Sequence, residues 1–328
     1  VLKRARRAYH ALAAEWLIDS SRDNGGEYAG LIAEHLERAG DEEQARVYLL
    51  RAAQAAAARY AQTETVTYTT RALALTPDSD LSGQWDLLWL REQALTMLGR
   101  HDDRQADLET MQHLATNLGD PHRQGLTSLN LASFAMACNK YGDAVAAVNT
   151  AIEIGRCSGD IYMQAKAHLQ LAKIHQIQGE TLESKSMAEK GLALIEGDQT
   201  SDREILRAKA DLLYVIGISY RRMNDKNQPR LYFEKSLSTF RQAGDRRGEA
   251  FTLSTIGMLS SFQGEYAVAR NYHEQALAIQ RQIGSRQGES AALNNLGIEA
   301  CRQGDYSTAR SCYEQSLRIC REIADGYN

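Results

Sequence analysis

Small and apolar residues recur along the chain at spacings that place them on one face of a helix. Ala269 and Ala276 are seven positions apart, and so are Ala309 and Ser316. Seven residues make two helical turns, so the members of each pair share a helix face. Turn-forming residues interrupt this pattern twice in every 40 positions. The pattern therefore predicts a chain of helices of roughly 16 residues each, joined by short turns.

The whole pattern returns after 40 residues. The heptapeptides at 244–250 and 284–290 nearly match, and Gly257 after the first is answered by Gly297 after the second. With Gly297 as the reference position of the last unit, the reference positions of the earlier units are Gly257, Gly217, Ala172, Ala132 and Glu92. One step is 45 residues long, because the polar stretch 196–201 adds a longer turn. A fixed period of this length is typical of stacked helical repeats.

Turn residues lie at fixed distances from these reference positions. Seven residues after them come Gly99, Asn139, Gly179, Asn224, Gly264 and Gly304. Thirteen residues before most of them come Gly119, Gly159, Gly244 and Gly284. Glycine and asparagine tolerate the left-handed conformation that ends a helix. We therefore expect six helix-turn-helix units at about 85–124, 125–164, 165–209, 210–249, 250–289 and 290–328.

This arrangement resembles the tetratricopeptide repeat, in the long variety found in light-chain adaptors of motor proteins and in bacterial regulators. The resemblance rests on the small residues 12 and 19 positions after the reference, on aromatic residues such as Tyr313, and on the Gly-x-Tyr turns of the last two units. It covers about 85–328 and implies an all-α fold, a right-handed solenoid of tandem helix-turn-helix units. Arg104 and Pro229 depart from the pattern at small-residue positions, and His273 departs at the aromatic one. We expect Pro229 in the first turn of a helix, where its missing N–H costs little.

Residues 1–84 form an irregular helical segment. Residues 31–52 fit one further unit on the same template, and a later helix should stop before Pro77, because the residue before a proline avoids the α region. The amino-acid sequence of residues 1–17 and 27–36 resembles the junction between the winged helix and the tetratricopeptide sensor of STAND-type signalling NTPases. That resemblance implies a P-loop ATPase module upstream of this chain, which would then be a fragment of a longer protein.

Composition excludes several classes of protein. The net charge is −4 and the pI is about 6.1, so nothing in the composition suggests nucleic-acid binding, which would need a basic face. No apolar run approaches the roughly 18 residues that a membrane helix needs, and no signal peptide is visible. The five cysteines are odd in number and include no Cys-x-x-Cys pair, which is typical of a reduced compartment. We therefore predict a cytoplasmic protein.

No motif of the sequence indicates catalysis. There is no P-loop, no Gly-x-Ser-x-Gly and no Ser/His/Asp order. The paired acids Glu42-Glu43 and Asp102-Asp103 each follow a turn, where they complement the positive end of a helix dipole. We therefore predict no catalytic residue and no cofactor, and we expect the chain itself not to be an enzyme.

Histidines and cysteines give two weaker candidates for chemistry. His168 and His175 are seven apart and can share a helix face, but no further ligand completes a tetrahedral metal site. We therefore interpret them as ordinary helix-surface histidines and predict no metal. Cys301, Cys312 and Cys320 fall in the final hairpin, where buried small hydrophobes are a simpler interpretation than redox sensing.

The sequence predicts a binding surface on the first helices of the units, which line the concave face of such a superhelix. The family resemblance implies a ligand contact two residues before each reference position, where the amides of Asn130, Gln170 and Asn295 can donate and accept hydrogen bonds. The other candidates near this line are Lys166, Lys173, Tyr214, Arg221, Ser254, Thr255, Asn294 and Arg302. Their four cations favour an acidic or carboxylate-bearing ligand. For any single residue, a solvated position on an amphipathic helix is the alternative.

Three functions are compatible with these features. The first is a ligand-sensing domain that binds a protein or peptide trigger and passes the change through residues 1–75 to the upstream NTPase module. The second is a constitutive scaffold that holds partners together without switching. The third is a sensor of small molecules. None of the three involves a membrane or a nucleic acid bound by this chain.

Overall fold

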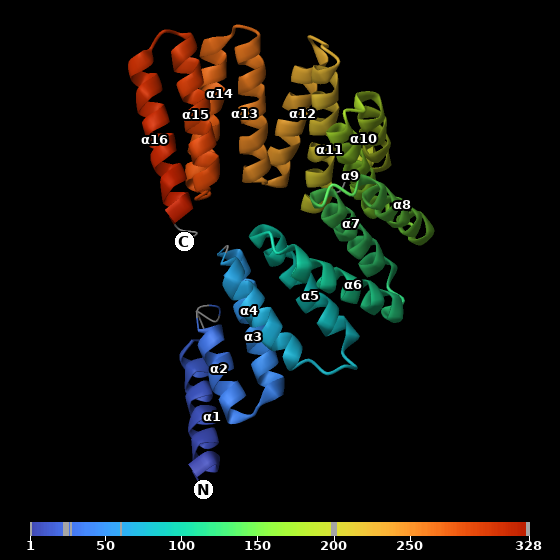
Figure 1. Cartoon of the computed structure of the whole chain (residues 1–328), viewed down its shortest axis with the longest axis vertical. Helices are drawn as coiled ribbons and strands as arrows, with labels where there is room; N and C mark the ends of the chain where they lie inside the picture. Colours follow the sequence, from blue (N-terminus) through green and yellow to red (C-terminus); the bar gives the residue numbers. More distant parts are fainter. Residues whose placement is uncertain (1, 22–25, 27, 60, 198–201, 326–328) are drawn as a thin grey trace. The chain divides into compact units, whose positions relative to one another are not determined.

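The computed structural model describes residues 2–21, 26, 28–59, 61–197 and 202–325, and every regular element in these ranges is an α-helix (Figure 1). The helices, in chain order, are α1 (Leu2–Ser20), α2 (Ala29–Ala39), α3 (Glu42–Ala58), α4 (Gln62–Ala74), α5 (Leu81–Leu98), α6 (His101–Leu118), α7 (Pro121–Ala137), α8 (Tyr141–Ser158), α9 (Ile161–Gln178), α10 (Thr181–Glu196), α11 (Arg203–Arg222), α12 (Gln228–Ala243), α13 (Arg246–Phe262), α14 (Tyr266–Gln282), α15 (Arg286–Arg302) and α16 (Tyr306–Asp325). The expected helix pairs are present from α5 onward, each beginning a few residues before the unit boundary inferred from the sequence.

The chain divides into two compact units, Val1–Ser158 with α1–α8 and Gly159–Asn328 with α9–α16. Within each unit, every helix packs against the next one along the chain. The all-α repeat solenoid is thereby confirmed. Within the first unit, α4 packs on α5 and so joins the irregular segment to the first regular pair.

Left-handed residues end the helices where the sequence predicted. Asn139 and Asn224 have φ angles of 59° and 57°, and all the predicted turn glycines also have positive φ. At Asn139 the following N–H, from Lys140, donates to the carbonyl of Ala135 at 2.8 Å. This bond satisfies one of the carbonyls that a helix end leaves without a partner. Pro229 lies in the first turn of α12, as expected.

The reference glycines allow the two helices of a pair to approach closely. A Cβ atom added to Gly217, Gly257 or Gly297 would lie 2.6–2.7 Å from a ring of the second helix in the same pair. The rings belong to Phe233, His273 and Tyr313, respectively. The period seen in the sequence is therefore a packing period, in which a missing side chain on one helix accommodates a ring on the other.

The repeated heptapeptide 244–250 forms a helix start held by ion pairs. Asp245 caps α13 by accepting the backbone N–H of Gly248 at 2.9 Å. Glu249 accepts Arg241 at 2.8 Å and Arg246 at 2.5 Å. The counterparts one repeat later are Ser285, Glu289, Arg281 and Arg286, with ion pairs of 2.9 and 2.6 Å. These contacts give Asp245, Gly248 and Glu249 of the heptapeptide a structural role.

In the first regular helix pair, α5 and α6, a buried ion pair takes the place of a contact between small residues. Glu92 and Arg104 are 3% and 5% exposed, and Arg104 Nε donates to Glu92 Oε1 at 2.6 Å. In every other regular helix pair, both corresponding positions hold a residue no larger than proline. The departure noted at Arg104 is therefore compensated by a second departure on the facing helix.

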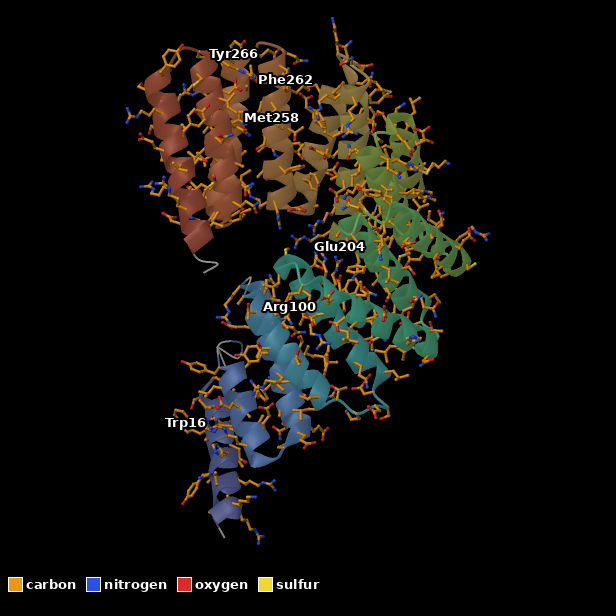
Figure 2. The ribbon with its side chains drawn as sticks, viewed as in Figure 1. Trp16, Arg100, Glu204, Met258, Phe262 and Tyr266 are labelled. Atoms are coloured by element: carbon orange, nitrogen blue, oxygen red, sulfur yellow. The ribbon has the colours of Figure 1, made fainter. Side chains whose placement is uncertain are left out.

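The first helix, α1, carries a stripe of exposed apolar side chains. Tyr9, Leu12 and Trp16 are 73%, 60% and 68% exposed, and their spacing places them along one side of the helix. Figure 2 labels Trp16 on α1. The acids Glu42 and Glu43 lie in the first turn of α3, as predicted. The predictions that involve Val1, Glu27, the turn residues 198–201 and the chain end at 328 lie outside the described residues.

Candidate functional site

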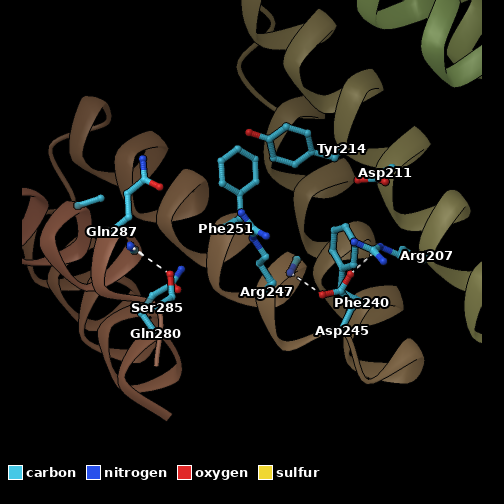
Figure 3. A pocket seen from close by; sticks show the side chains of 13 residues that line it. Arg207, Asp211, Tyr214, Phe240, Asp245, Arg247, Phe251, Gln280, Ser285 and Gln287 are labelled. Carbon is cyan, nitrogen blue, oxygen red and sulfur yellow. Dashed lines mark hydrogen bonds and ion pairs between the residues drawn. The ribbon is translucent and has the colours of Figure 1, made fainter. Parts of the chain in front are cut away.

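A hollow of about 420 Å³ crosses the first helices of three successive pairs in the second unit, α11, α13 and α15 (Figure 3). We call it the aromatic hollow. Its lining includes Arg207, Asp211, Tyr214, Arg247, Phe251 and Gln287. Arg207, Arg247 and Gln287 occupy equivalent positions in the three repeats, 40 residues apart. The repeat therefore presents three equivalent side chains in a row along this face.

Two rings form the apolar part of the aromatic hollow. Tyr214 and Phe251 pack with their ring centroids 5.2 Å apart and their planes tilted by 44°. Tyr214 also packs against Phe233 and shares a hydrogen bond of 3.0 Å with the hydroxyl of Thr255, while burial raises its pKa. Phe251 is 58% exposed. A fixed tyrosine thus supports a phenylalanine that is available to a ligand.

The charged side chains of the aromatic hollow differ in their partners. Arg207 Nε lies 3.0 Å from Asp245 Oδ2. Asp211 is half-buried, and burial raises its pKa although the nearby Lys173 and Arg207 act in the opposite direction. Arg247 is exposed and makes no ion pair within the described ranges of the chain. Its guanidinium is therefore the group that can bind a carboxylate here.

Only one of the residues proposed from the sequence, Tyr214, lines the aromatic hollow. Ser254 and Asn294 are its equivalents in the next two repeats, the former half-buried and the latter exposed. Thr255 is buried beneath the rings, where it bonds Tyr214 and the carbonyl of Phe251. Thr255 therefore supports the surface from below.

The remaining polar candidates of α9 and α11 have varied surroundings. Lys166 lies over the ring of Tyr162 at 5.1 Å, and burial lowers its pKa. Gln170 is half-buried and has an interaction partner within the protein. Lys173 and Arg221 are exposed. No pocket described in the second unit gathers the basic residues that the sequence placed together, so their joint action on one ligand stays a prediction.

Asn130 lies in the first unit and has an internal role. Its Nδ2 donates to Glu92 Oε2 at 3.0 Å, and Glu92 is the buried carboxylate paired with Arg104. This bond uses the amide to satisfy a buried charge. The amides of Asn130, Gln170 and Asn295 are therefore not equivalent, since Asn130 is held by a hydrogen bond that the repeat spacing did not reveal.

Asn295 and Arg302 line a second hollow of about 120 Å³, between α13, α14 and α15, which we call the polar hollow. Arg302 donates to the hydroxyl of Ser261, lies 3.6 Å from Glu299 and packs over the ring of Phe262 at 5.8 Å. His273 and Glu299 also line the polar hollow. The sequence marked His273 as a departure from the repeat, and it did not single out Glu299.

The structure also shows what residue spacing failed to identify in the aromatic hollow. The lining residues Arg207, Arg247 and Gln287 lie ten positions before their reference residues, and Asp211 and Phe251 lie six before. From the sequence, the position six before the reference was considered only at Lys166, and the position ten before it was not considered. Reading the repeat at six and ten residues before it would have found the exposed Phe251 and Arg247.

Other candidate chemistry is limited in the part of the chain that the structure covers. Those residues contain no group of three or more histidine, cysteine or acidic side chains that could hold a metal ion. His175 bonds Glu180 at 2.5 Å, and burial lowers the pKa of His168. All five cysteines are free thiols. Among the described helices, none combines the length and the apolar character needed to span a bilayer.

A family model supports the repeat assignment. The model described as tetratricopeptide repeat matches residues 213–282 and 248–322. No curated protein sequence matches the chain. Residues 213–322 therefore carry tetratricopeptide repeats, in agreement with the helix pairs and packing glycines described above.

Solved structures extend the likeness of fold over most of the chain. The apo form of the quorum sensor NprR from B. thuringiensis is 12% identical with a TM-score of 0.65, over 96% of this chain and 87% of that one. A Rap protein complexed with Competence and Sporulation Factor is 11% identical with a TM-score of 0.63, over 95% and 81%. A STAND protein with a tetratricopeptide repeat sensor from Pyrococcus horikoshii is 14% identical with a TM-score of 0.61, over 96% of this chain and 46% of that one.

Proposed function

We propose that this tetratricopeptide-repeat chain is a non-catalytic binding domain that holds a protein or peptide segment in the aromatic hollow of its second unit. The observation that carries the proposal is the pair formed by Phe251 and Arg247, an exposed ring and a cation that no described carboxylate neutralises. An extended segment would place an apolar side chain against Phe251 and Tyr214 and a carboxylate on Arg247. The Rap structure, solved in complex with a factor, supports binding as a role for this fold.

A selection from a displayed library of random peptides, carried out on the whole chain, tests this proposal. We expect the selected peptides to lose at least tenfold in affinity for Arg247→Ala and for Phe251→Ala, measured by isothermal calorimetry. Both side chains are exposed, so the variants should fold normally.

The matched controls for this test are Arg310→Ala on α16 and Leu182→Ala on α10, which remove an exposed arginine and an exposed leucine elsewhere in the second unit. The affinity should be unchanged in both. Peptides that bind the Arg247 and Phe251 variants as well as the unaltered chain would refute the assignment to the aromatic hollow.

We further propose that the chain is the sensor of a larger STAND-type signalling ATPase in the cytoplasm, with the NTPase module on the N-terminal side. The text resemblance of residues 1–17 and 27–36 supports this role, and so does the similar fold of the STAND sensor. The exposed stripe Tyr9, Leu12 and Trp16 on α1 is a surface that an adjoining module would cover. A ligand can switch such a protein only if it binds two states with different affinity.

The sensor role is tested on a longer protein that includes the upstream module. Deleting residues 85–328 should change its ATPase rate or its oligomeric state. Unchanged activity and assembly would favour the constitutive scaffold. The small-molecule sensor would be favoured instead if a thermal-shift screen with metabolites raised the melting temperature and the selected peptides did not.

A further inference from the structure

The polar hollow contains two buried polar side chains that the rest of the described protein leaves partly unpaired. His273 is 1% exposed, and its Nδ1 has no hydrogen-bond partner among the described residues. Glu299 is 3% exposed, and its Oε2 likewise has none. Both residues line the same hollow. Such groups destabilise a fold unless something supplies their hydrogen bonds.

The repeat itself does not require these polar groups. One repeat earlier, the positions of His273 and Glu299 are occupied by Phe233 and Leu259. Phe233 is fully buried in the apolar core of its own junction, against the reference glycine of its pair. The same backbone geometry is therefore filled by apolar side chains elsewhere in the chain, so packing alone does not account for the polar pair.

The charges around the polar hollow favour a neutral occupant. Arg302 lies 3.6 Å from Glu299 Oε1 and offsets its charge. Burial lowers the pKa of His273 to about 4, so its imidazole is neutral at pH 7. The carboxylate oxygen Oε2 of Glu299 can only accept, so the occupant has to bring a donor. The volume of about 120 Å³ is well above the roughly 10–15 Å³ that a single water molecule needs.

Part of the lining of the polar hollow is apolar and exposed to solvent. Met258 and Phe262 of α13 form this part and are 40% and 72% exposed (Figure 2). A group that contacts them and the buried polar atoms has to combine an apolar stem with a polar end. Half-buried Asn295 on α15 lies in the same lining and has both a donor and an acceptor to offer.

We propose that the polar hollow binds a primary amide, the side chain of a glutamine or asparagine in the bound protein segment, with its N–H donated to Glu299 Oε2 and its carbonyl accepting from Asn295. This inference rests on the proposed function only for the source of the amide. The amide is neutral, it carries the required donor, and the methylenes of glutamine match the apolar part of the lining. The proposed subsite lies where α13, α14 and α15 meet, and α15 also lines the aromatic hollow.

The first test uses propionamide as the probe on the whole chain, labelled uniformly with nitrogen-15. Propionamide should shift the imidazole signals of His273 in a saturable way. Its dissociation constant should be at least tenfold lower than those of propylammonium and propionate. The matched control is the double variant His273→Phe and Glu299→Leu, which installs the residues of the preceding junction. It should remain folded, should melt at a higher temperature, and should leave α15 without propionamide-dependent amide shifts.

Three outcomes would overturn the proposal. The first is the absence of a saturable shift, which is expected if the hollow holds water alone. The second is tighter binding of propylammonium than of propionamide. The third is equal binding of propionamide to the double variant and to the unaltered chain. Arg247→Ala should leave the propionamide shifts unchanged. A failure of peptide binding in the aromatic hollow is thereby distinguished from a failure of the amide subsite.

The second test uses the selected peptides. Replacing a glutamine or asparagine of a peptide by leucine should weaken binding to the unaltered chain at least tenfold and binding to the double variant much less. If the peptides bind through Arg247 and Phe251 but no amide substitution matters, the amide subsite is refuted while the proposed function stands.

Discussion

Glu92 in the first unit and Glu299 in the second are both buried carboxylates at positions where the other repeats have small or less polar residues, but their surroundings differ. Glu92 Oε1 accepts Arg104 at 2.6 Å and Oε2 accepts Asn130 at 3.0 Å. Glu299 has one oxygen 3.6 Å from Arg302 and the other without a partner among the described residues. Full pairing is typical of a structural network, and incomplete pairing is typical of a site that binds something.

The same comparison separates two asparagines that share one register position. Asn130 and Asn295 both lie two residues before a reference position. Asn130 completes the network around Glu92, whereas Asn295 lines the polar hollow. Equivalent positions in a repeat therefore have equivalent backbones but not equivalent roles, because the role depends on what the neighbouring unit places opposite.

The largest effect is expected for Arg104→Ala, which leaves Glu92 buried without its cation. The free energy of unfolding should fall by about 3–5 kcal/mol. All three tryptophans of the chain lie in the first unit, so urea unfolding followed by tryptophan fluorescence reports this unit. The control is the double variant Glu92→Gly and Arg104→Ala, which installs the residues of the last repeat. It should recover most of the loss, and a double variant as unstable as the single one would contradict the pairing.

The next effect is acid sensitivity from His273. Its pKa is lowered from 6.5 to about 4 in the folded protein, so between these values the unfolded chain binds the proton more strongly. The corresponding stability is present above pH 6.5 and is lost as the pH falls towards 4, by roughly 3 kcal/mol in total. Urea unfolding followed by circular dichroism at several pH values should give the free energy of unfolding as a function of pH. This free energy should depend less steeply on pH for His273→Phe than for the unaltered chain. Equal slopes for the two proteins would show that His273 is protonated as easily when folded as when unfolded.

A smaller difference is expected between Asn130→Ala and Asn295→Ala. The first removes a hydrogen bond to a buried charged group and should cost about 1.5–3 kcal/mol. The second removes a half-buried side chain that lines the polar hollow and should change the free energy of unfolding by less than about 0.5 kcal/mol. Equal losses in urea unfolding would remove the distinction between the two asparagines.

The smallest effect is expected for the exposed ion pairs of the repeated heptapeptide. Arg281 bonds Glu289 at 2.9 Å, but its side chain is 50% exposed. Arg281→Ala should therefore lower the free energy of unfolding by less than about 1 kcal/mol, because solvent screens such pairs. A loss as large as that of Arg104→Ala would mean that burial does not decide the strength of these pairs.

Much of the fold could be predicted from the period of the sequence. The helix ends at Asn139 and Asn224 follow from the tolerance of asparagine for positive φ, and Pro229 takes a first-turn position for a local reason as well. These features depend on residues close together in the chain. The packing of Gly257 against the second helix of its pair could also be expected, since the repeat places small and large residues at fixed separations.

Less of the candidate site could be predicted. Tyr214 was expected and lines the aromatic hollow, but Phe251 and Arg247 were missed because the argument did not follow the positions six and ten before the reference through all the repeats. The pairing of Arg104 with Glu92 was also missed, since Arg104 looked like an isolated departure from the repeat and Glu92 was taken only as a reference position. Contacts between side chains of different helices depend on direction and distance in space, and a spacing rule for one helix does not contain that information.

The sequence by itself determined that this chain is a stack of helix pairs, where the turns fall, and which residues repeat every 40 positions. Local conformational preference and helical periodicity are sufficient for these conclusions. Only the tertiary structure decided which repeated residues are used for packing and which have polar atoms without a partner among the described residues. Asn130 bonds a buried carboxylate, while His273 and Glu299 line a hollow with polar atoms unpaired in the described chain. The reason is physical: the free energy of a buried polar group is set by the partner it meets in space, not by its position in the repeat.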